Sequence, residues 1–253
     1  MSLIGVLSRD SLPGESTPAL AGIGHAAHRA GSGLLLCADL DFVDTRGVAL
    51  SGCVLLDRTA DEHDLACLAD HAIPFVSIGR RDSTSRQIPY VDVDYAAGVR
   101  DLVARTAALG HRQIVYIGLP GGTASAERLH GFRAAAEAMN VRGMHAPAVW
   151  LDQLVRIGVT AVIAEHPDDA SALVRAARSR GMSVPGELSV LALDVPETDL
   201  LGLTGLRVPR WETGRRAVYL LARLPQKRPH ELIACEFVRG TTLSAPEDHR
   251  GRR

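Results

Sequence analysis

The sequence predicts an α/β protein built from two similar lobes, each containing a parallel sheet. Strand-length apolar runs alternate with amphipathic helical segments along most of the 253 residues. Several of these runs are apolar throughout, which is typical of strands that are covered on both faces. A hydrophobic content of 46% is enough for an extensive core. Together these observations indicate Rossmann-like lobes in which helices cover both faces of each sheet.

The first half of the chain predicts a series of strand and helix units. Residues 3–8 form an apolar run of strand length. Residues 17–30 place Leu20 and Ile23 on one helical face, and Gly31 follows where such a helix would end. The next strands are expected at residues 34–38, 53–56 and 75–78, and the next helices at residues 61–71 and 94–109.

The second half repeats the same order. Strands are predicted at residues 114–118, 159–164 and 188–193, and helices at residues 125–139 and 168–180. After Asp194 the pattern breaks, and a helix at residues 211–224 and a strand at residues 231–239 close the chain. Two such series predict two lobes between which the chain crosses more than once. We place the amino-terminal lobe at residues 3–110 with 208–225, the carboxy-terminal lobe at residues 111–207 with 226–245, and a tail at residues 246–253.

Charge balance, the lack of long apolar stretches and the positions of the cysteines exclude several classes of protein. The chain has 28 Lys and Arg against 29 Asp and Glu, and this balance argues against a free-standing nucleic-acid binder. The absence of a membrane-length apolar stretch and of a signal-like amino terminus predicts a cytoplasmic protein with no membrane partner. Buried thiols are expected instead of disulfides or a metal cluster, because the four cysteines are far apart and lie mostly in apolar runs: Cys37, Cys53, Cys67 and Cys235.

Sequence patterns of common enzymes are missing from the chain. Residues 118–123 are rich in glycine, as in a phosphate loop, but they lack the Lys and Ser/Thr that contact phosphate and Mg²⁺. His25 and His28 share a helical face without a third metal ligand. No nucleophile is paired with a base. We therefore predict a protein that is not an enzyme, with no catalytic residues, no cofactor and no metal.

One basic side chain marks a candidate ligand site. Arg128 lies in the segment 125–133, which follows the strand predicted at residues 114–118. We expect Arg128 in the first turn of a helix that opens at the carboxyl end of that strand, where open α/β folds bind their ligands. The alternative is a surface arginine that pairs with Glu127 or Asp194.

Short motifs along nearly the whole chain occur in the order and spacing of a known family. They include Ser125-Ala126-Glu127-Arg128 and segments at residues 73–78, 91–98, 109–114, 131–132, 180–185, 189–194, 203–214 and 239–242. With these motifs the chain resembles the LacI/GalR family of transcriptional regulators. Each motif is weak alone, and the specificity of the resemblance comes from many of them in one register.

The resemblance implies a periplasmic-binding-protein-like (type I) effector domain. It implies that a small molecule binds in the cleft between the lobes and changes how the two subunits of a homodimer are oriented. Family members read an operator through an amino-terminal headpiece, and this chain starts at the first strand of the effector core. We therefore expect the chain as given to contact operator DNA only through a headpiece that it does not contain.

The resemblance also selects the remaining candidate effector contacts. Asp194 ends the strand at residues 188–193, Trp150 lies where the family often has a stacking aromatic, and Asp94 is either a contact or an N-cap. Two departures bring in further candidates. Glu15 and Ser16 lie where the family has aromatics, and His166 precedes Pro167 where the family has an Asn-Asp pair.

The predicted function is ligand sensing and dimerisation in a LacI-type repressor. Charges of both signs, Arg128 against Asp194 and Glu15, favour a polyhydroxylated or zwitterionic effector over a strongly anionic one, and a sugar or related metabolite fits this description. The alternative within the same fold is a periplasmic solute-binding protein of a transporter, which would act as a monomer. A small α/β enzyme is a third possibility, but it would need a catalytic group that the sequence does not provide.

Overall fold

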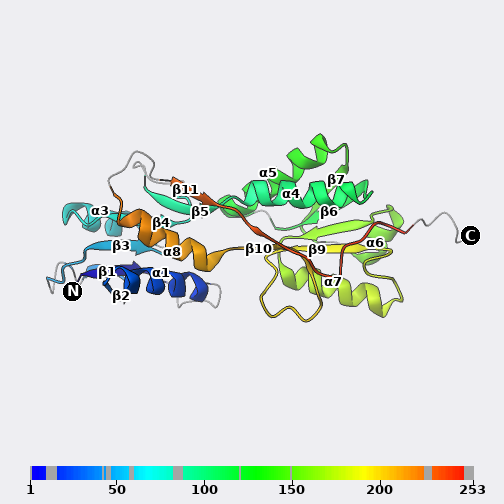
Figure 1. Ribbon diagram of the computed structural model, residues 1–253. Coiled ribbons are helices and arrows are strands. Elements are labelled where there is room, and N and C mark those ends of the chain that lie inside the picture. The colour runs from blue at the N-terminus through cyan, green and yellow to red at the C-terminus, as the bar shows by residue number, and fades with distance from the viewer. Residues whose placement is uncertain are drawn as a thin grey trace, which may run out of the picture. The chain divides into compact units, whose positions relative to one another are not determined.

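Two six-stranded α/β units make up the described chain. The computed structural model describes residues 2–9, 16–41, 43, 47–56, 60–81, 88–119, 121–148, 150–224 and 230–247 (Figure 1). Unit 1 comprises Met1–Val93 and Pro209–Ile233, and unit 2 comprises Asp94–Val208 and Ala234–Arg253. The chain therefore passes between the units three times, as the sequence predicts for two lobes. The predicted lobe boundary at residue 110 falls one helix later than the boundary at Val93.

Unit 1 is a fully parallel sheet with the strand order β11-β5-β4-β3-β1-β2. Its elements are β1 Leu3–Leu7, α1 Thr17–Arg29, β2 Gly33–Cys37, β3 Gly52–Leu55, α3 Glu62–Asp70, β4 Phe75–Ile78, β5 Tyr90–Val93, α8 Arg210–Leu221 and β11 His230–Ile233. Successive strand residues point to opposite faces, so each strand contributes to two cores. Val6 and Val54 pack in the core that includes α1 and α8, whereas Leu7, Leu55 and residues of α3 form the other.

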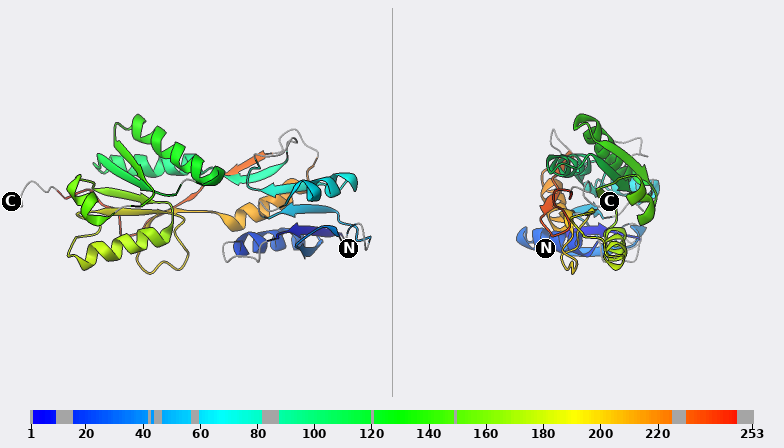
Figure 2. Two further views of the ribbon diagram at one scale, coloured as in Figure 1. Left: turned by 180° about the vertical axis from the view of Figure 1, so that it is seen from behind. Right: turned by 90° about the vertical axis from the view of Figure 1, so that its right-hand side faces the viewer.

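Unit 2 repeats this arrangement with the strand order β12-β10-β9-β8-β6-β7. Its elements are α4 Tyr95–Ala108, β6 Gln113–Ile117, α5 Gly122–Ala138, β7 Arg142–Ala146, α6 Leu151–Arg156, β8 Ala161–Ala164, α7 Pro167–Ser179, β9 Ser189–Leu193, β10 Thr204–Arg207 and β12 Glu236–Val238. Only β12 is antiparallel to its neighbour. The core around Val115 and Val162 includes α6 and α7, and the core around Ile114 and Ile163 includes α4 and α5. Figure 2 shows α4 and α5 on one face of this sheet and α7 on the other.

The predicted fold class is confirmed, and most predicted elements lie within one to three residues of the observed ones. Four elements were not predicted: β5, β7, α6 and β10. The prediction of one strand at residues 231–239 is wrong, because Ala234 and Cys235 are not in a strand and separate two shorter strands. Its first half is β11 of unit 1, and its second half is β12 of unit 2.

All four cysteines are free thiols. Cys53 and Cys67 are buried, and Cys37 and Cys235 are half-buried. Burial raises the pKa of Cys37 and of Cys235 to about 11, so both thiols stay protonated at neutral pH.

Among the described helices, none combines the length and the apolar character needed to cross a membrane.

Candidate functional site

Polar side chains collect where the parallel strands of unit 2 end. Gly118 follows β6, Glu165 and His166 follow β8, and Asp194 follows β9. Because these strands are parallel, their carboxyl ends meet at one edge of the sheet. In open α/β sheets this edge is the usual place for ligands.

A buried ion pair lies at this edge. Nη1 of Arg128 donates to Oε1 of Glu165 over 2.9 Å, and the two side chains are only 14% and 4% exposed. The Tyr116 hydroxyl donates to Oε2 of Glu165 over 3.1 Å. Ser125 Oγ is also 3.1 Å from Oε2, and it is 2.9 Å from the carbonyl oxygen of Leu119, so its single proton is shared between two acceptors. The carboxylate is therefore held by up to three donors.

Glycine at position 118 gives the carboxylate its space. A methyl group added there would overlap Oε2 of Glu165 and come within 2.9 Å of Cε1 of Tyr116. The backbone of Glu165 is fixed as well, because its N–H donates to the carbonyl oxygen of Ile117 over 2.7 Å. Position, rotamer and hydrogen bonds of Glu165 are thus set by β6 and α5 together.

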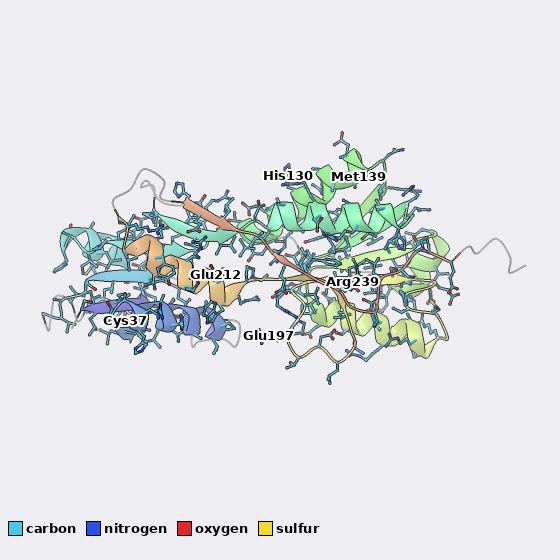
Figure 3. The ribbon with its side chains drawn as sticks, in the orientation of Figure 1. Cys37, His130, Met139, Glu197, Glu212 and Arg239 are labelled. Atoms are coloured by element: carbon cyan, nitrogen blue, oxygen red, sulfur yellow. The ribbon has the colours of Figure 1, made fainter. Side chains whose placement is uncertain are left out.

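Arg128 is held from a second side by an aromatic ring. Its guanidinium carbon lies 4.3 Å from the centre of the Tyr95 ring, at the start of α4. This is within the range of a cation–π interaction. Figure 3 shows His130, which is exposed on α5, whereas Arg128 is largely buried on the same helix.

The electrostatics of this cluster keep its groups in their donating or accepting forms. Burial raises the pKa of Tyr116 far above its ordinary value, and the neighbouring Glu165 carboxylate raises it further. Burial lowers the pKa of Arg128, but Tyr95 and Glu165 outweigh this effect, and the net pKa is raised. Tyr116 therefore stays a donor and Arg128 stays a cation at all physiological pH values.

Arg128 has hydrogen-bonding capacity left over. A guanidinium carries five N–H donors, and Glu165 uses one of them. The Nε atom of Arg128 is buried and has no hydrogen-bond partner in the structure. An unsatisfied buried donor is costly, and a ligand with an acceptor oxygen would remove that cost.

The expected position of Arg128 is wrong by one turn. We predicted the helix from residue 125 with Arg128 in its first turn, but α5 begins at Gly122, so Arg128 lies in the second turn. The last two residues of the glycine-rich segment 118–123 are therefore helical. The expected alternative partners of Arg128 were Glu127 and Asp194, and its observed partner is Glu165.

Three more candidate residues lie at the carboxyl edge of the unit 2 sheet. Asp194 has a positive φ of 111°, which is rare outside glycine, and its Oδ1 accepts from the Val208 N–H over 3.4 Å. His166 is the N-cap residue of α7, and its exposed side chain makes no capping hydrogen bond. Trp150 precedes α6 and is 78% exposed. It lines a pocket of about 330 Å³ together with Leu151, Asp169 and Arg180.

The remaining candidates have other positions. Asp94 is the N-cap of α4 and accepts from the Ala97 N–H over 2.9 Å, which matches the capping alternative. Ser16 precedes α1 in unit 1, and its side chain makes no capping hydrogen bond. Glu15 lies outside the described residues.

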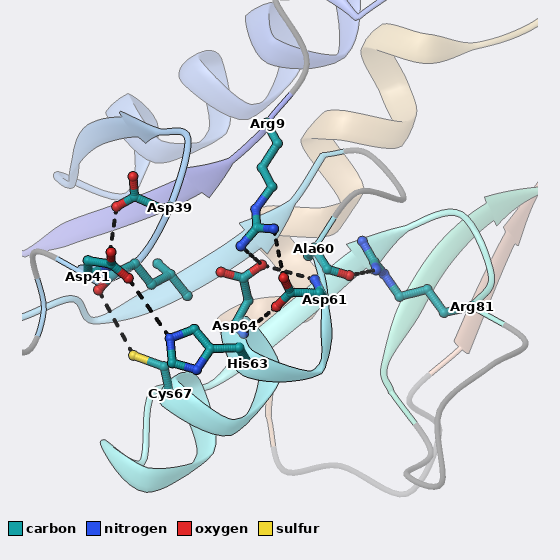
Figure 4. A network of polar contacts seen from close by, with 10 residues as sticks. Arg9, Asp39, Asp41, Ala60, Asp61, His63, Asp64, Cys67 and Arg81 are labelled. Atoms are coloured by element: carbon teal, nitrogen blue, oxygen red, sulfur yellow. Dashed lines mark hydrogen bonds and ion pairs between the residues drawn. The ribbon is translucent and has the colours of Figure 1, made fainter.

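Unit 1 has a polar network of its own at the carboxyl edge of its sheet (Figure 4). Arg9 follows β1 and pairs with Asp61 over 2.7 Å and with Asp64 over 2.9 Å. Asp61 and Asp64 also form a capping box at the start of α3. Arg81 follows β4 and donates to the Ala60 carbonyl oxygen over 2.8 Å. The arginines of this edge thus anchor the loops of unit 1.

Sequence reasoning missed Glu165, the residue that fixes Arg128. We expected the family's polar pair to be replaced by His166 and Pro167, but β8 ends at Ala164, so the first residue after the strand is Glu165. A signal was present: Glu165 is an acid directly after an apolar strand, in the same half of the chain as Arg128.

Among the described residues no group of His, Cys, Asp and Glu could hold a metal ion.

Comparisons with known proteins identify the family of this domain. The sequence model of the periplasmic binding protein-like domain matches residues 103–243, more than half of the chain. An uncharacterized HTH-type transcriptional regulator in the aml 5′ region of Streptomyces limosus is 32% identical over 222 residues, which cover 79% of this chain and 60% of that protein. The HTH-type transcriptional regulator CelR of Thermobifida fusca is 28% identical over 193 residues, covering 69% of this chain and 57% of that protein. The chain thus spans about 60% of the length of these curated relatives.

Solved structures share the fold at lower sequence identity. A LacI family transcriptional regulator from Enterococcus faecium with bound ribose has a TM-score of 0.75 and 19% identity, covering 96% of this chain and 99% of that one. A CelR–cellobiose complex has a TM-score of 0.74 and 20% identity, covering 96% and 85%. The relatives are transcriptional regulators, and the family model covers most of unit 2, including the Arg128 site. The chain belongs to the periplasmic binding protein-like domain family.

Proposed function

We propose that this chain senses a sugar or a related small polar metabolite for a LacI-type transcriptional repressor. The observation that carries the proposal is Arg128, a buried cation at the carboxyl edge of the unit 2 sheet with an unpartnered Nε. Hydroxyl oxygens of a sugar can accept from such a guanidinium. Solved relatives with ribose and with cellobiose support the same ligand class.

The other contacts of the effector follow from the same edge. Asp194 offers a carboxylate, His166 offers an imidazole, and Trp150 offers an exposed ring for stacking. Asp94, Ser16 and Glu15 are further contacts in this proposal. Of all these, Arg128 is the residue whose loss should matter most, because it is largely buried at the sheet edge and has an unpartnered Nε.

The partners of the chain are part of the proposal. We infer a homodimer, because Leu200, 98% exposed, is apolar surface that association would bury. Operator DNA would be read by a separate DNA-binding headpiece, which the HTH-type relatives support. A regulator of this kind acts in the cytoplasm.

A thermal-shift panel tests the ligand site. Ribose, glucose, sucrose and cellobiose are added to the unaltered chain and to Arg128→Ala. A bound sugar adds about 2.7 kcal/mol of stability at a hundredfold excess over its Kd, which raises the Tm. We expect at least one sugar to raise the Tm of the unaltered chain and no sugar to raise that of Arg128→Ala.

Each shift is read against the variant's own Tm without sugar, because removing Arg128 also leaves Glu165 buried without its cation. Arg133→Ala is the matched control, since Arg133 is exposed on the same helix. An intact shift in Arg128→Ala would show that the site assignment is wrong.

The second candidate function is a periplasmic solute-binding protein that feeds a transporter. The match to the periplasmic binding protein-like domain favours it, because the fold is compatible with both functions. This alternative requires a monomer, so the oligomeric state separates the two functions.

A further inference from the structure

The binding edge of unit 2 carries a neutralised pair of charges. The Arg128 cation and the Glu165 carboxylate are 2.9 Å apart and both largely buried. We propose that this site takes an uncharged polyhydroxylated molecule, and that Glu165 is the specificity-determining residue that excludes anionic ones. The inference rests on the proposed sugar-sensing function and names the charge class of its ligand.

Glu165 is built into the site as a fixed anion. The Tyr116 hydroxyl and the shared Ser125 hydroxyl hold one carboxylate oxygen, and Arg128 holds the other. These neighbours occupy both oxygens of the carboxylate. The Glu165 carboxylate occupies space that a side chain at position 118 would fill, and glycine leaves that space open. The carboxylate therefore belongs to the site whether or not a ligand is bound.

Arg128 alone would be a good anion receptor, because a guanidinium matches carboxylate and phosphate geometry. In this chain its charge is already balanced, and an anion placed against it would lie within a few ångströms of Glu165. Like charges brought this close in a desolvated site are strongly unfavourable. A cationic ligand would meet the same difficulty with Arg128.

A neutral hydroxyl avoids both penalties. It can accept from the remaining N–H groups of Arg128, including the unpartnered Nε, without adding charge. The Tyr95 ring, 4.3 Å from the guanidinium carbon, holds Arg128 in place for this contact. A hydroxyl can also donate to Glu165. Polyols supply donors and acceptors together, as this pair of side chains requires.

The test compares matched neutral and anionic sugars by calorimetric titration. The probes are glucose with glucuronate, and ribose with its phosphate ester, titrated into the unaltered chain and into Glu165→Gln. We expect the unaltered chain to prefer at least one neutral probe over its anionic counterpart by about tenfold or more. In Glu165→Gln we expect this preference to shrink or reverse, because Arg128 is then an unbalanced cation.

Asp168→Asn is the matched control, because it removes one negative charge from α7 without removing a contact of Arg128. It should keep the preference of the unaltered chain. If Glu165→Gln does not fold, the comparison within the unaltered chain still decides the question. Binding of an anionic probe as tight as that of its neutral counterpart would overturn the inference and leave sugar sensing intact. A panel in which no sugar of either charge binds would contradict both.

Discussion

Glu165 shows why a single buried residue can set the chemistry of a site. Burying an ion pair is costly, and the cost is met only when geometry is good and further hydrogen bonds satisfy the charges. Here Tyr116, Ser125 and Arg128 supply those bonds. The result is a preorganised polar cluster at the carboxyl edge of the sheet.

His111 is a second buried polar residue, and it should make stability depend on pH. Its Nε2 donates to the Ser244 carbonyl oxygen over 2.8 Å, so Nδ1 accepts from the Thr160 hydroxyl over 2.9 Å. Burial lowers the pKa of His111 below its ordinary 6.5, and the nearby Arg112 adds to this, against the opposing effect of the Ser244 carbonyl. The folded protein thus prefers neutral His111.

Because the unfolded chain binds this proton more readily, the free energy of unfolding should fall as the pH drops from about 6.5 through the folded pKa. The loss is at most about 1.4 kcal/mol per pH unit. We expect His111→Asn to lose this part of the pH dependence in urea denaturation between about pH 7.5 and pH 5. The exposed His63→Asn is the control and should retain it. Parallel pH profiles for the unaltered chain and His111→Asn would contradict this account.

At the residue scale, the sequence singled out Arg128 because its motif has a known register, and its role as an effector contact stays a prediction. Glu165 was missed although the sequence places it directly after an apolar strand, because the neighbouring His166 was expected to be the important side chain. Which of two adjacent residues turns inward depends on the twist of the strand end and on the space left by Gly118.

At the scale of elements, α1 and α8 of unit 1 illustrate packing decided by glycine. A methyl group on Gly22 would overlap the Trp211 carbonyl oxygen, and one on Gly214 would overlap the Ala19 carbonyl oxygen. The backbones of the two helices are therefore in direct contact at Gly22 and Gly214. Gly24 is on the same helix, and a methyl group there would be 3.6 Å from the nearest atom, Leu34 Cδ1.

We expect Gly22→Ala and Gly24→Ala to have opposite effects on stability. Gly22→Ala should lower the free energy of unfolding by about 1 to 3 kcal/mol, because the helices must separate. Gly24→Ala should raise it by about 0.5 to 1 kcal/mol, because alanine is the better helix former and makes an ordinary contact. Urea denaturation of both variants measures the difference. Equal effects would show that the two helices do not depend on close approach at Gly22.

Elements with strong periodicity were predictable, and four short elements were not. The helices α1, α4 and α7 have apolar faces and recognisable ends, and they were placed within two residues. The edge strand β7 reads Arg-Gly-Met-His-Ala, which contains no apolar run. The last strand was predicted as one segment, because the sequence between His230 and Val238 has no signal for a change of sheet. That change depends on the topology of both units.

At the scale of the whole molecule, the two units repeat one strand order. Both have the first strand beside the second and third, and both receive a sixth strand from the end of the chain. The alternation of strands and helices was enough to predict this duplication. The point at which the chain leaves unit 1 was not predictable, because the helix α4 follows β5 without a break in pattern.

Light scattering on the purified chain separates the two proposed functions. We expect a mass twice that of one chain at high protein concentration, because a regulator of this kind acts as a homodimer. Leu200→Glu places a charge on the exposed apolar surface and should shift the population toward monomers. A strict monomer at all concentrations would favour the solute-binding alternative.

The most direct test of the central claim is calorimetric titration of the panel sugar with the largest thermal shift into the unaltered chain and Arg128→Lys. Lysine keeps the positive charge but lacks the planar set of N–H donors that can serve Glu165 and a ligand at once. We expect a single binding site in the unaltered chain and an affinity at least about tenfold weaker in Arg128→Lys. Equal affinities in the two proteins would show that Arg128 does not hold the effector.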